Sequence, residues 1–255
     1  MDRTPSFRIK NEEIRSDVEY PRFRPTLWFN DQIINAYLQY LSARFPDCIL
    51  VHSMTTSQMT STPDSRGTRN FMQNYPVDGK RLVLFPINIG NFHWVLGVYQ
   101  VPSRRVVIYD SMDGQAVRQT DLQRLVAAIV TWSGQDVLHR EITPMNIQLD
   151  KYNCGPYVLA MMECLCHQLD FVETLGGPST TKSSISFFRK RILVRLWQDK
   201  CRFNDSHQCR GTTRRGTRCL RKACLYPSDT YRCRQHINDV IHIDDSDDDD
   251  VIEVD

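Results

Sequence analysis

The first apolar pattern along this chain has helical spacing. Apolar residues recur at positions i, i+1, i+4, i+5 and i+8, as Ile33, Ile34, Tyr37, Leu38 and Leu41. This spacing predicts an amphipathic helix, which Asn30 or Asp31 can cap at its start. Polar and small residues dominate positions 52–80, so we expect a long loop there with helical turns near 56–59.

Runs of β-branched and apolar residues occupy the middle of the chain. Residues 81–87, 94–101 and 105–109 are separated by short turns, which predicts three strands in a meander. The other predicted elements are a strand at 48–51, a helix at 120–131, a strand at 137–144, a buried helix that begins at Cys154 and an amphipathic helix with a basic face at 184–198. Helices at both ends of a central sheet indicate an α+β domain that ends near residue 200.

Length and composition exclude several classes of protein. The chain has 255 residues, of which 41% are hydrophobic, and a domain of roughly 200 residues can build a core without disulfides. No apolar run approaches the roughly 18 residues of a membrane span, and the charged N-terminus is unlike a signal peptide. We therefore expect a soluble intracellular protein, nuclear or cytoplasmic, without membrane contact, whose nine cysteines do not form disulfides.

Charge and cysteine content divide the chain into parts. Residues 207–236 hold eight Lys or Arg and one acidic residue, whereas residues 237–255 hold nine acidic residues and no Lys or Arg. Five of the nine cysteines lie between positions 201 and 233. The predicted organisation is an extended lead-in at 1–25, a globular domain at 26–200, a basic Cys/His module at 201–238 and an acidic tail at 239–255.

Four residues of the globular domain have the types and the order that a cysteine protease requires. Cys154 begins a buried helix, where unpaired N–H groups favour a thiolate. His93 begins a strand and Asp110 ends the adjacent β run, so the two can meet at one sheet end as a base and its orienting group. Gln148 can donate to an oxyanion together with the Cys154 N–H. Each residue alone is also compatible with packing or a helix cap, and only their joint order favours catalysis.

Four segments resemble the ubiquitin-like-protein-specific cysteine proteases, a family best known for its SUMO proteases. They are LWFNDQIINAYLQYL at 27–41, NFHWVLGVY at 91–99, VVIYDSM at 106–112 and QLDKYNCGP at 148–156. The resemblance implies a papain-like α+β fold with a central mixed sheet flanked by helices. It also implies catalysis by Cys154, His93 and Asp110, with Gln148 in the oxyanion hole and no cofactor.

The same resemblance implies that Trp28 and Trp94 form the walls of a narrow tunnel. A modifier that ends in Gly-Gly has no side chains there, so two flat indole rings can clamp it and reject bulkier residues. Core packing is the alternative role for both tryptophans. The chain departs from the family pattern at Phe29 (usually Leu), at Asn153 (more often Asp) and at Pro156 (more often Met, Val or Ile), although proline is compatible with a first helical turn.

The basic module offers three thiolates and one imidazole, which suit tetrahedral zinc. The predicted ligands are Cys209, Cys219, Cys233 and His236, with His207 and Cys224 as alternative ligands. The module has too little apolar mass for a core, so a metal would supply its folding energy. The other interpretation is a disordered basic segment with free thiols. Its charge is compatible with weak nucleic-acid contact or with attraction to an acidic partner.

The acidic tail holds two short apolar segments that resemble SUMO-interacting motifs. In such motifs a short apolar strand pairs with an exposed sheet edge, and flanking acids meet a basic rim. The apolar residues are Val240, Ile241 and Ile243 in the first segment and Val251, Ile252 and Val254 in the second. Two motifs would favour binding of modifier chains through effective concentration. The alternative is a solvated acidic tail.

Together these features predict a cysteine isopeptidase or endopeptidase that cleaves after the terminal Gly-Gly of a ubiquitin-like modifier. SUMO is the modifier that the sequence favours. A protease of the same fold directed at NEDD8 or ubiquitin is the alternative within the class. A catalytically silent adaptor that binds SUMO or nucleic acid is the alternative from another class.

Overall fold

The computed structural model describes residues 6–9, 12–15, 20–24, 26–63, 65–170 and 182–201, and three short strands at 207–208, 222–225 and 231–232. The chain divides into two compact units, residues 1–189 and residues 190–255. Within the described residues, no helix is both long and apolar enough to cross a membrane.

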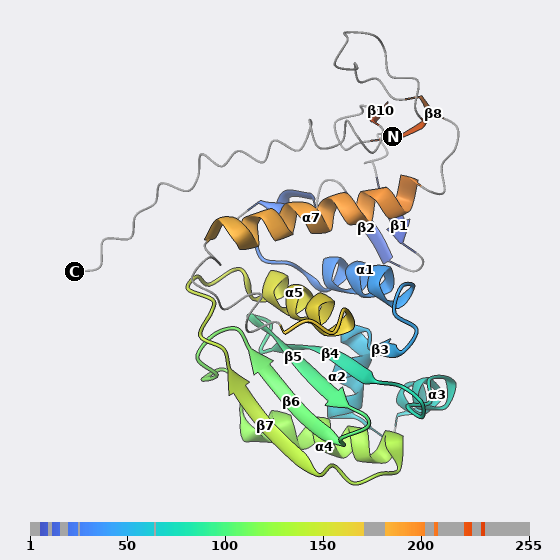
Figure 1. Cartoon of the computed structure of the whole chain (residues 1–255), viewed down its shortest axis with the longest axis vertical. Coiled ribbons are helices and arrows are strands. Elements are labelled where there is room, and N and C mark those ends of the chain that lie inside the picture. The colour runs from blue at the N-terminus through green and yellow to red at the C-terminus, as the bar shows by residue number, and fades with distance from the viewer. Residues whose placement is uncertain are drawn as a thin grey trace, which may run out of the picture. The chain divides into compact units, whose positions relative to one another are not determined.

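A five-stranded mixed sheet forms the centre of the first unit (Figure 1). Its strands, in spatial order, are β3 (Cys48–Leu50), β4 (Leu82–Ile89), β5 (His93–Gln100), β6 (Arg105–Asp110) and β7 (His139–Pro144). Strands β4, β5 and β6 follow one another in antiparallel pairs, as the meander predicted. The outer strands β3 and β7 run parallel to β4 and β6 respectively, which makes the sheet mixed.

Helices cover both faces of this sheet. Helices α2 (Ser53–Ser61) and α4 (Gln119–Ser133) share a buried apolar cluster with one face. Helix α5 (Cys154–Cys166) lies against β5 on the other face (Figure 1). Gly97 allows α4 to approach β5, because a Cβ at this position would lie 2.8 Å from Leu125 Cδ2. These layers confirm the predicted α+β fold class.

Helix α1 (Asp31–Ser42) is the amphipathic helix that the apolar spacing predicts. Asn30 caps it, since its side chain accepts the N–H of Ile33 at 3.2 Å. The apolar stripe of the helix is buried, and α1 contacts α5. The cap fixes where the helix starts, and so it also fixes the position of Trp28 and Phe29 just before it.

The polar region 52–80 is largely helical, and the long loop that we expected there is wrong. Helix α2 takes up Ser53–Ser61 and a second helix, α3, takes up Arg66–Asn74. His52 and Ser65 accept backbone N–H groups at the two helix starts. Hydroxyl groups within α2 bond to carbonyl groups one turn earlier, and one side of the helix is buried. Caps and tertiary burial therefore outweigh the weak helix propensity of these residues.

Residues 1–25, which we expected as an extended lead-in, contain regular structure. Strands β1 (Ser6–Ile9) and β2 (Glu12–Arg15) form an antiparallel pair. A 3-10 helix, η1 (Tyr20–Phe23), comes next, and Phe23 at its end is buried. The segment before α1 is thus partly packed onto the domain.

Helix α7 (Lys182–Cys201) spans the boundary between the two units. The second unit also holds a small antiparallel sheet in the order β10 (Tyr231–Arg232), β9 (Lys222–Leu225) and β8 (His207–Gln208). The remaining predicted sites lie outside the described residues. These are the zinc ligands Cys209, Cys219, Cys233 and His236 and the tail residues Val240, Ile241, Ile243, Val251, Ile252 and Val254.

Candidate active site

The candidate base and its orienting carboxylate meet at one end of the sheet. His93 is the first residue of β5 and Asp110 is the last residue of β6, and these strands are antiparallel. His93 Nε2 lies 2.7 Å from Asp110 Oδ1, and both side chains are buried. The same carboxylate oxygen accepts the N–H of Met112 at 2.9 Å. The strand pairing and this backbone contact together hold the carboxylate against the imidazole.

The surroundings of His93 favour its protonated form. Burial alone would lower the pKa of His93, but the hydrogen bonds to Asp110 and Cys154, together with the charges of both groups, raise it to about 9. Because Nε2 faces Asp110, Nδ1 is the ring nitrogen that remains for Cys154. At neutral pH the ring is therefore an imidazolium between the Asp110 carboxylate and the sulfur of Cys154.

Cys154 is the first residue of α5 and is 1% exposed. The N–H groups of a first helical turn have no acceptor inside the helix, and the helix dipole adds partial positive charge at this end. Gly155 gives the turn room, because a Cβ at this position would lie 2.9 Å from the Cβ of Phe29. Pro156 fits because its missing N–H would have no partner in the first turn.

The side-chain amide of Gln148 is held from both sides. Its Oε1 accepts the Ser111 hydroxyl at 2.7 Å, and its Nε2 donates to the backbone carbonyl of Asp150 at 2.7 Å. The Asp150 carboxylate lies 3.5 Å from the same nitrogen, too far to hold the second hydrogen firmly. One Nε2 hydrogen is therefore available to another acceptor. Sequence reasoning found Gln148 but missed Ser111, although Ser111 directly follows Asp110 in the Tyr-Asp-Ser segment.

Asp150 organises the turn that leads into α5, and the sequence analysis did not single it out. Its Oδ1 accepts the N–H groups of Tyr152 and Asn153 at 3.0 and 2.8 Å. Its Oδ2 accepts Nδ2 of Asn153 at 2.8 Å, while Oδ1 of Asn153 accepts from Arg189 at 2.6 Å. An amide can donate and accept at once. The departure from the family pattern at Asn153 is therefore satisfied by its neighbours.

A buried arginine links this turn to the segment before α1. Arg189, in α7, is fully buried, donates to Asn153 and to the backbone carbonyl groups of Arg22 and Leu27, and lies 4.6 Å from the ring centroid of Phe29. Burial lowers the pKa of Arg189 to about 10, so it stays charged at neutral pH. The sequence predicted a basic face on this helix, but the charge of Arg189 has its partners in the interior.

A cavity of about 410 Å³ is lined by both candidate gate residues, Trp28 and Trp94. Trp94 is buried and donates its indole N–H to a backbone carbonyl at 3.0 Å, whereas Trp28 is 37% exposed. Met54 and Phe92 also line this cavity and are more than half exposed. Trp94 directly follows His93 in β5, whereas His93, Asp110 and Cys154 are not among the residues that line this cavity.

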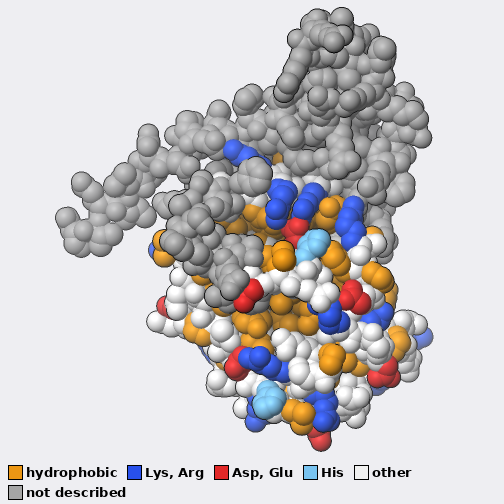
Figure 2. Space-filling model, in the orientation of Figure 1, with side chains coloured by type: hydrophobic (Ala, Val, Ile, Leu, Met, Phe, Trp, Pro, Cys, Tyr) orange, Lys and Arg blue, Asp and Glu red, His pale blue; other side chains and the backbone are white. Residues whose placement is uncertain are grey.

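Apolar side chains gather in the middle of the face that Figure 2 shows, with charged side chains around them. Exposed apolar surface of this kind is a frequent mark of a binding surface. The largest exposed apolar side chains of the described residues are Leu27, Trp28, Met54, Tyr75, Phe92, Leu138, Leu149 and Leu169. Three of these, Trp28, Met54 and Phe92, line the cavity described above.

The arrangement has the parts that nucleophilic acyl transfer needs. A thiol at a helix start can attack a carbonyl, a charged imidazole beside it can donate a proton to the leaving group, and a carboxylate fixes the imidazole. A held amide N–H and the N–H groups at the helix start can stabilise an oxyanion. The fold and this site define a cysteine protease.

The chain belongs to the Ulp1 protease family, whose C-terminal catalytic domain matches residues 27–196. The match begins at the first of the four segments that resemble the family and extends into α7. It confirms the resemblance and the predicted class of enzyme.

Known proteins agree with this assignment. The chain is similar to NEDD8-specific protease 1 of Arabidopsis thaliana, with 28% identity over 170 residues that cover 60% of this chain and 70% of that protein. It is also similar to Ubiquitin-like-specific protease 1 of Saccharomyces cerevisiae, with 24% identity over 150 residues, but it spans only 24% of that longer protein.

A solved structure shows the same fold. It contains the C-terminal Ulp1 protease domain in complex with Smt3, the yeast orthologue of SUMO, and it matches with a TM-score of 0.65 at 18% identity. The match covers 78% of this chain and 90% of that domain. The predicted protease fold is thereby confirmed.

Proposed function

We propose that this protein is an isopeptidase and processing protease that cleaves after the C-terminal Gly-Gly of a ubiquitin-like modifier, and that SUMO is this modifier. The observation that carries the proposal is the hydrogen-bonded group of Cys154, His93 and Asp110. The cavity that Trp28 and Trp94 line supports it, because Trp94 is the neighbour of His93 in β5. An adaptor without activity would not require this group to be intact.

In the proposed mechanism, the Cys154 thiolate attacks the carbonyl carbon of the terminal glycine. The charge that develops on the carbonyl oxygen is stabilised by the remaining Nε2 hydrogen of Gln148 and by the N–H of Cys154. His93 then donates its Nδ1 proton to the leaving amine as the C–N bond breaks. The product is a thioester between the modifier and Cys154, together with a free amine.

Hydrolysis of this thioester completes the reaction. His93 is now neutral and takes a proton from water, which attacks the thioester carbonyl. The same two donors stabilise the second oxyanion. The C–S bond breaks, the modifier leaves with a free carboxylate, and the thiolate–imidazolium pair is restored. No cofactor takes part in these steps.

The two tryptophans would select glycine in this reaction. Because glycine has no side chain, a Gly-Gly segment can lie flat between indole rings where any larger residue would clash. Trp94 is fixed by its hydrogen bond, and the more exposed Trp28 is free to complete the clamp when the substrate enters.

The choice among modifiers rests on different features. The two apolar segments in the acidic tail resemble SUMO-interacting motifs and favour SUMO. The similarity to a NEDD8-specific protease of Arabidopsis thaliana supports NEDD8 as the second candidate.

Electrophilic probes built on the C-termini of SUMO, NEDD8 and ubiquitin test the proposal. We expect covalent labelling with the SUMO probe, at a rate at least tenfold above that with the other two, and no labelling of Cys154→Ala. Faster labelling by the NEDD8 probe would transfer the function to the second candidate. If the wild type reacts with none of the probes, or if Cys154→Ala still reacts, the protease mechanism proposed here is wrong.

The C-terminal parts extend the proposal. The module at 201–238 would bind one zinc ion through Cys209, Cys219, Cys233 and His236. Within the described residues, no group of three or more His, Cys, Asp or Glu could hold a metal, and these four ligands lie outside them. Metal analysis of the purified chain tests the module. We expect a content near one zinc per chain, and a lower content in the control variant Cys233→Ser, His236→Ala.

We further propose weak nucleic-acid contact through this module and a nuclear or cytoplasmic location.

A further inference from the structure

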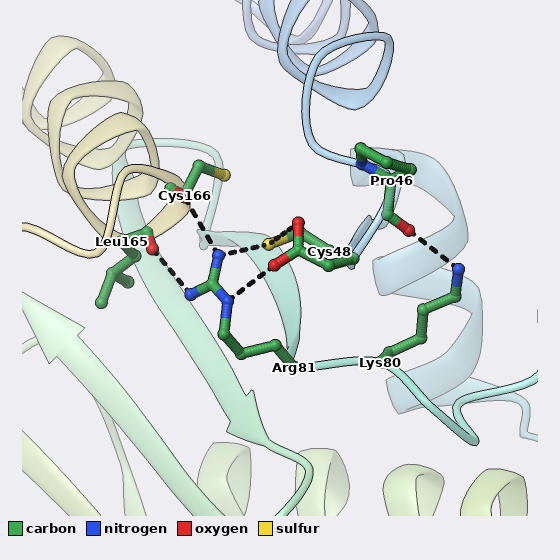
Figure 3. A network of polar contacts seen from close by, with 7 residues as sticks. Pro46, Cys48, Lys80, Arg81, Leu165 and Cys166 are labelled. Atoms are coloured by element: carbon green, nitrogen blue, oxygen red, sulfur yellow. Dashed lines mark hydrogen bonds and ion pairs between the residues drawn. The ribbon is translucent and has the colours of Figure 1, made fainter.

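A second pair of thiols lies outside the protease site. Cys48 begins β3 and Cys166 ends α5, and both are reduced and buried. Arg81, just before β4, reaches toward both (Figure 3). Its Nη2 lies 3.2 Å from Cys48 Sγ and donates to the carbonyl oxygen of Cys166 at 3.0 Å, and its Nη1 donates to the carbonyl oxygen of Leu165 at 3.0 Å. One guanidinium therefore caps the end of α5 and contacts a sulfur atom.

The two sulfur atoms interact with each other. The thiol of Cys166 is hydrogen-bonded to Cys48, and this bond lowers the pKa of the Cys48 thiol. Burial opposes the lowering, and the positive charge of Arg81 adds to it. The same hydrogen bond and burial raise the pKa of Cys166. Cys48 is thus the nucleophilic member of the pair, and Cys166 is the thiol that stays protonated.

The acidic neighbour does not cancel this effect. Asp47 Oδ1 lies 3.7 Å from Cys48 Sγ, and its charge alone would disfavour a thiolate. However, Asp47 Oδ2 is paired with Arg81 Nε at 2.7 Å, so the carboxylate already has a cation as its partner. A guanidinium beside a thiol is an environment that produces reactive cysteines.

We propose that Cys48 and Cys166 form a redox-active pair that hydrogen peroxide oxidises to a disulfide, independently of the catalytic thiol. Cys48 lines a cavity of about 570 Å³ together with Pro46 and Lys80, through which a molecule as small as peroxide can approach. The disulfide would join β3 to the far end of α5. That helix begins with Cys154, so oxidation would clamp the helix that carries the proposed nucleophile.

The chemistry balances with peroxide as the oxidant. The Cys48 thiolate attacks one peroxide oxygen, the O–O bond breaks, and Cys48 becomes a sulfenic acid while hydroxide leaves and is protonated to water. Cys166 then attacks the Cys48 sulfur, the S–O bond breaks, and the departing hydroxide takes the proton of the Cys166 thiol. Two thiols and one peroxide give one disulfide and two waters. The sulfur atoms must approach to about 2.05 Å.

Peptide mapping of the full chain tests the pair. Cys154→Ala removes the catalytic thiol, so the result does not depend on the proposed protease function. After peroxide treatment and alkylation, trypsin releases residues 45–66, with Cys48 as their only cysteine, and residues 152–182, which contain Cys164 and Cys166. We expect a disulfide between these two peptides and a higher melting temperature of the oxidised protein.

Matched variants identify which cysteine forms the disulfide with Cys48. Added to the Cys154→Ala chain, Cys166→Ser should abolish the link and leave Cys48 as a sulfenic acid that dimedone labels, whereas Cys164→Ser should keep the link. A link through Cys164 would contradict the assignment. So would the absence of any link at a peroxide concentration that oxidises Cys154 in the unsubstituted chain.

A second comparison tests the role of Arg81. Arg81→Gln should slow formation of the link by about tenfold, because less of Cys48 is then a thiolate. Arg69→Gln removes the same charge from an exposed side chain of α3 that does not line this cavity, and it should leave the rate unchanged. Equal rates in the two variants, with circular dichroism showing both folded, would show that the guanidinium does not activate Cys48.

Discussion

At the scale of single residues, the charge of the His93 side chain is set by its surroundings. Buried imidazoles are usually neutral, because burial disfavours the charged form. Here the carboxylate of Asp110, 2.7 Å away, together with Cys154 reverses that preference. The pH dependence of kcat/KM should therefore change when the Asp110 carboxylate is removed.

Asp110→Asn removes the charge that holds the proton on His93. With the pKa of His93 near 9, kcat/KM of the wild type should fall on its alkaline side near pH 9. In Asp110→Asn this limb should move to lower pH, and kcat/KM at pH 7.5 should fall by roughly 10²–10⁴. The exposed Asp113→Asn is the control and should match the wild type. An unchanged alkaline limb in Asp110→Asn would count against this role of the carboxylate.

The positive charge of His93 beside Asp110 also contributes to folding stability. The pKa of His93 is higher in the folded protein than the ordinary value of 6.5, so the contribution is complete below pH 6.5 and is lost as pH rises through about 9. Urea unfolding of the wild type and of Asp110→Asn at pH 6 and at pH 9.5 measures it. The difference between the two proteins should shrink at the higher pH.

Ser111→Ala should affect the rate more than substrate binding. The hydroxyl of Ser111 fixes the amide of Gln148 through Oε1, and without it the amide can turn away from the oxyanion. We expect kcat to fall by about tenfold with little change in KM. Alkylation of Cys154 by iodoacetamide, which needs no oxyanion donor, should keep its rate. Ser103→Ala, at an exposed turn, is the matched control, and a change confined to KM would argue against this role.

Arg189→Met should destabilise the domain by about 3 kcal/mol, since it leaves one buried amide oxygen and two backbone carbonyl groups without their donor. Arg189→Lys should recover only part of this loss, because an ammonium cannot reproduce the planar fork. Chemical unfolding measures both variants. The exposed Arg69→Met in α3 is the control, with a change below about 0.5 kcal/mol expected.

Among the elements, the start of α5 is closely packed against the segment before α1. Gly155→Ala would place a Cβ 2.9 Å from the Cβ of Phe29, which should cost about 1–3 kcal/mol of stability and displace Cys154. Gly67→Ala in α3 is the matched comparison, because its Cβ would meet only a flexible side-chain atom at 3.4 Å. We expect it to stabilise the protein by about 0.5–1 kcal/mol. Thermal melts of both variants give the contrast, which would disappear if the Phe29 contact were not rigid.

The helices α2 and α3 lie in a region where the sequence predicted a long loop. Most of their residues are polar, so propensity and apolar spacing indicated no more than helical turns near 56–59. Caps at His52 and Ser65 and the buried side of α2 stabilise these helices despite their weak helix propensity. Both caps are visible in the sequence only once the helices are known.

For the whole molecule, the acidic tail should act on chains of modifiers rather than on the bond that is cut. Deleting residues 239–255 should leave the cleavage of a single-modifier substrate within twofold of the wild type. Binding of a chain of several modifiers should weaken by about tenfold or more, because two linked sites act through effective concentration. Replacing only the six apolar tail residues with Ala, which keeps every acid, should have the same effect. If only the deletion weakens binding, charge alone is responsible.

Much of the catalytic domain could be predicted from the sequence, because its chemistry resides in short contiguous segments. The helix start at Cys154, the strands around His93 and Asp110, and the position of Gln148 each follow from local apolar spacing and from the family resemblance, and the sheet was predicted nearly to its ends. The residues that hold the site, Ser111 and Arg189, were missed as such.

The fold class, the family and the candidates for the reactive groups could be predicted from the sequence alone, since periodicity and short motifs are local properties of a chain. The charge of His93, the orientation of the Gln148 amide, the burial of Arg189 and the proximity of Cys48 and Cys166 to Arg81 became known from the tertiary structure. Each of these depends on contacts between segments far apart in the chain, such as Arg189 with Leu27 and Arg81 with Cys166. Burial makes those contacts strong, because inside the protein a charge or a hydrogen bond has no water to replace its partner.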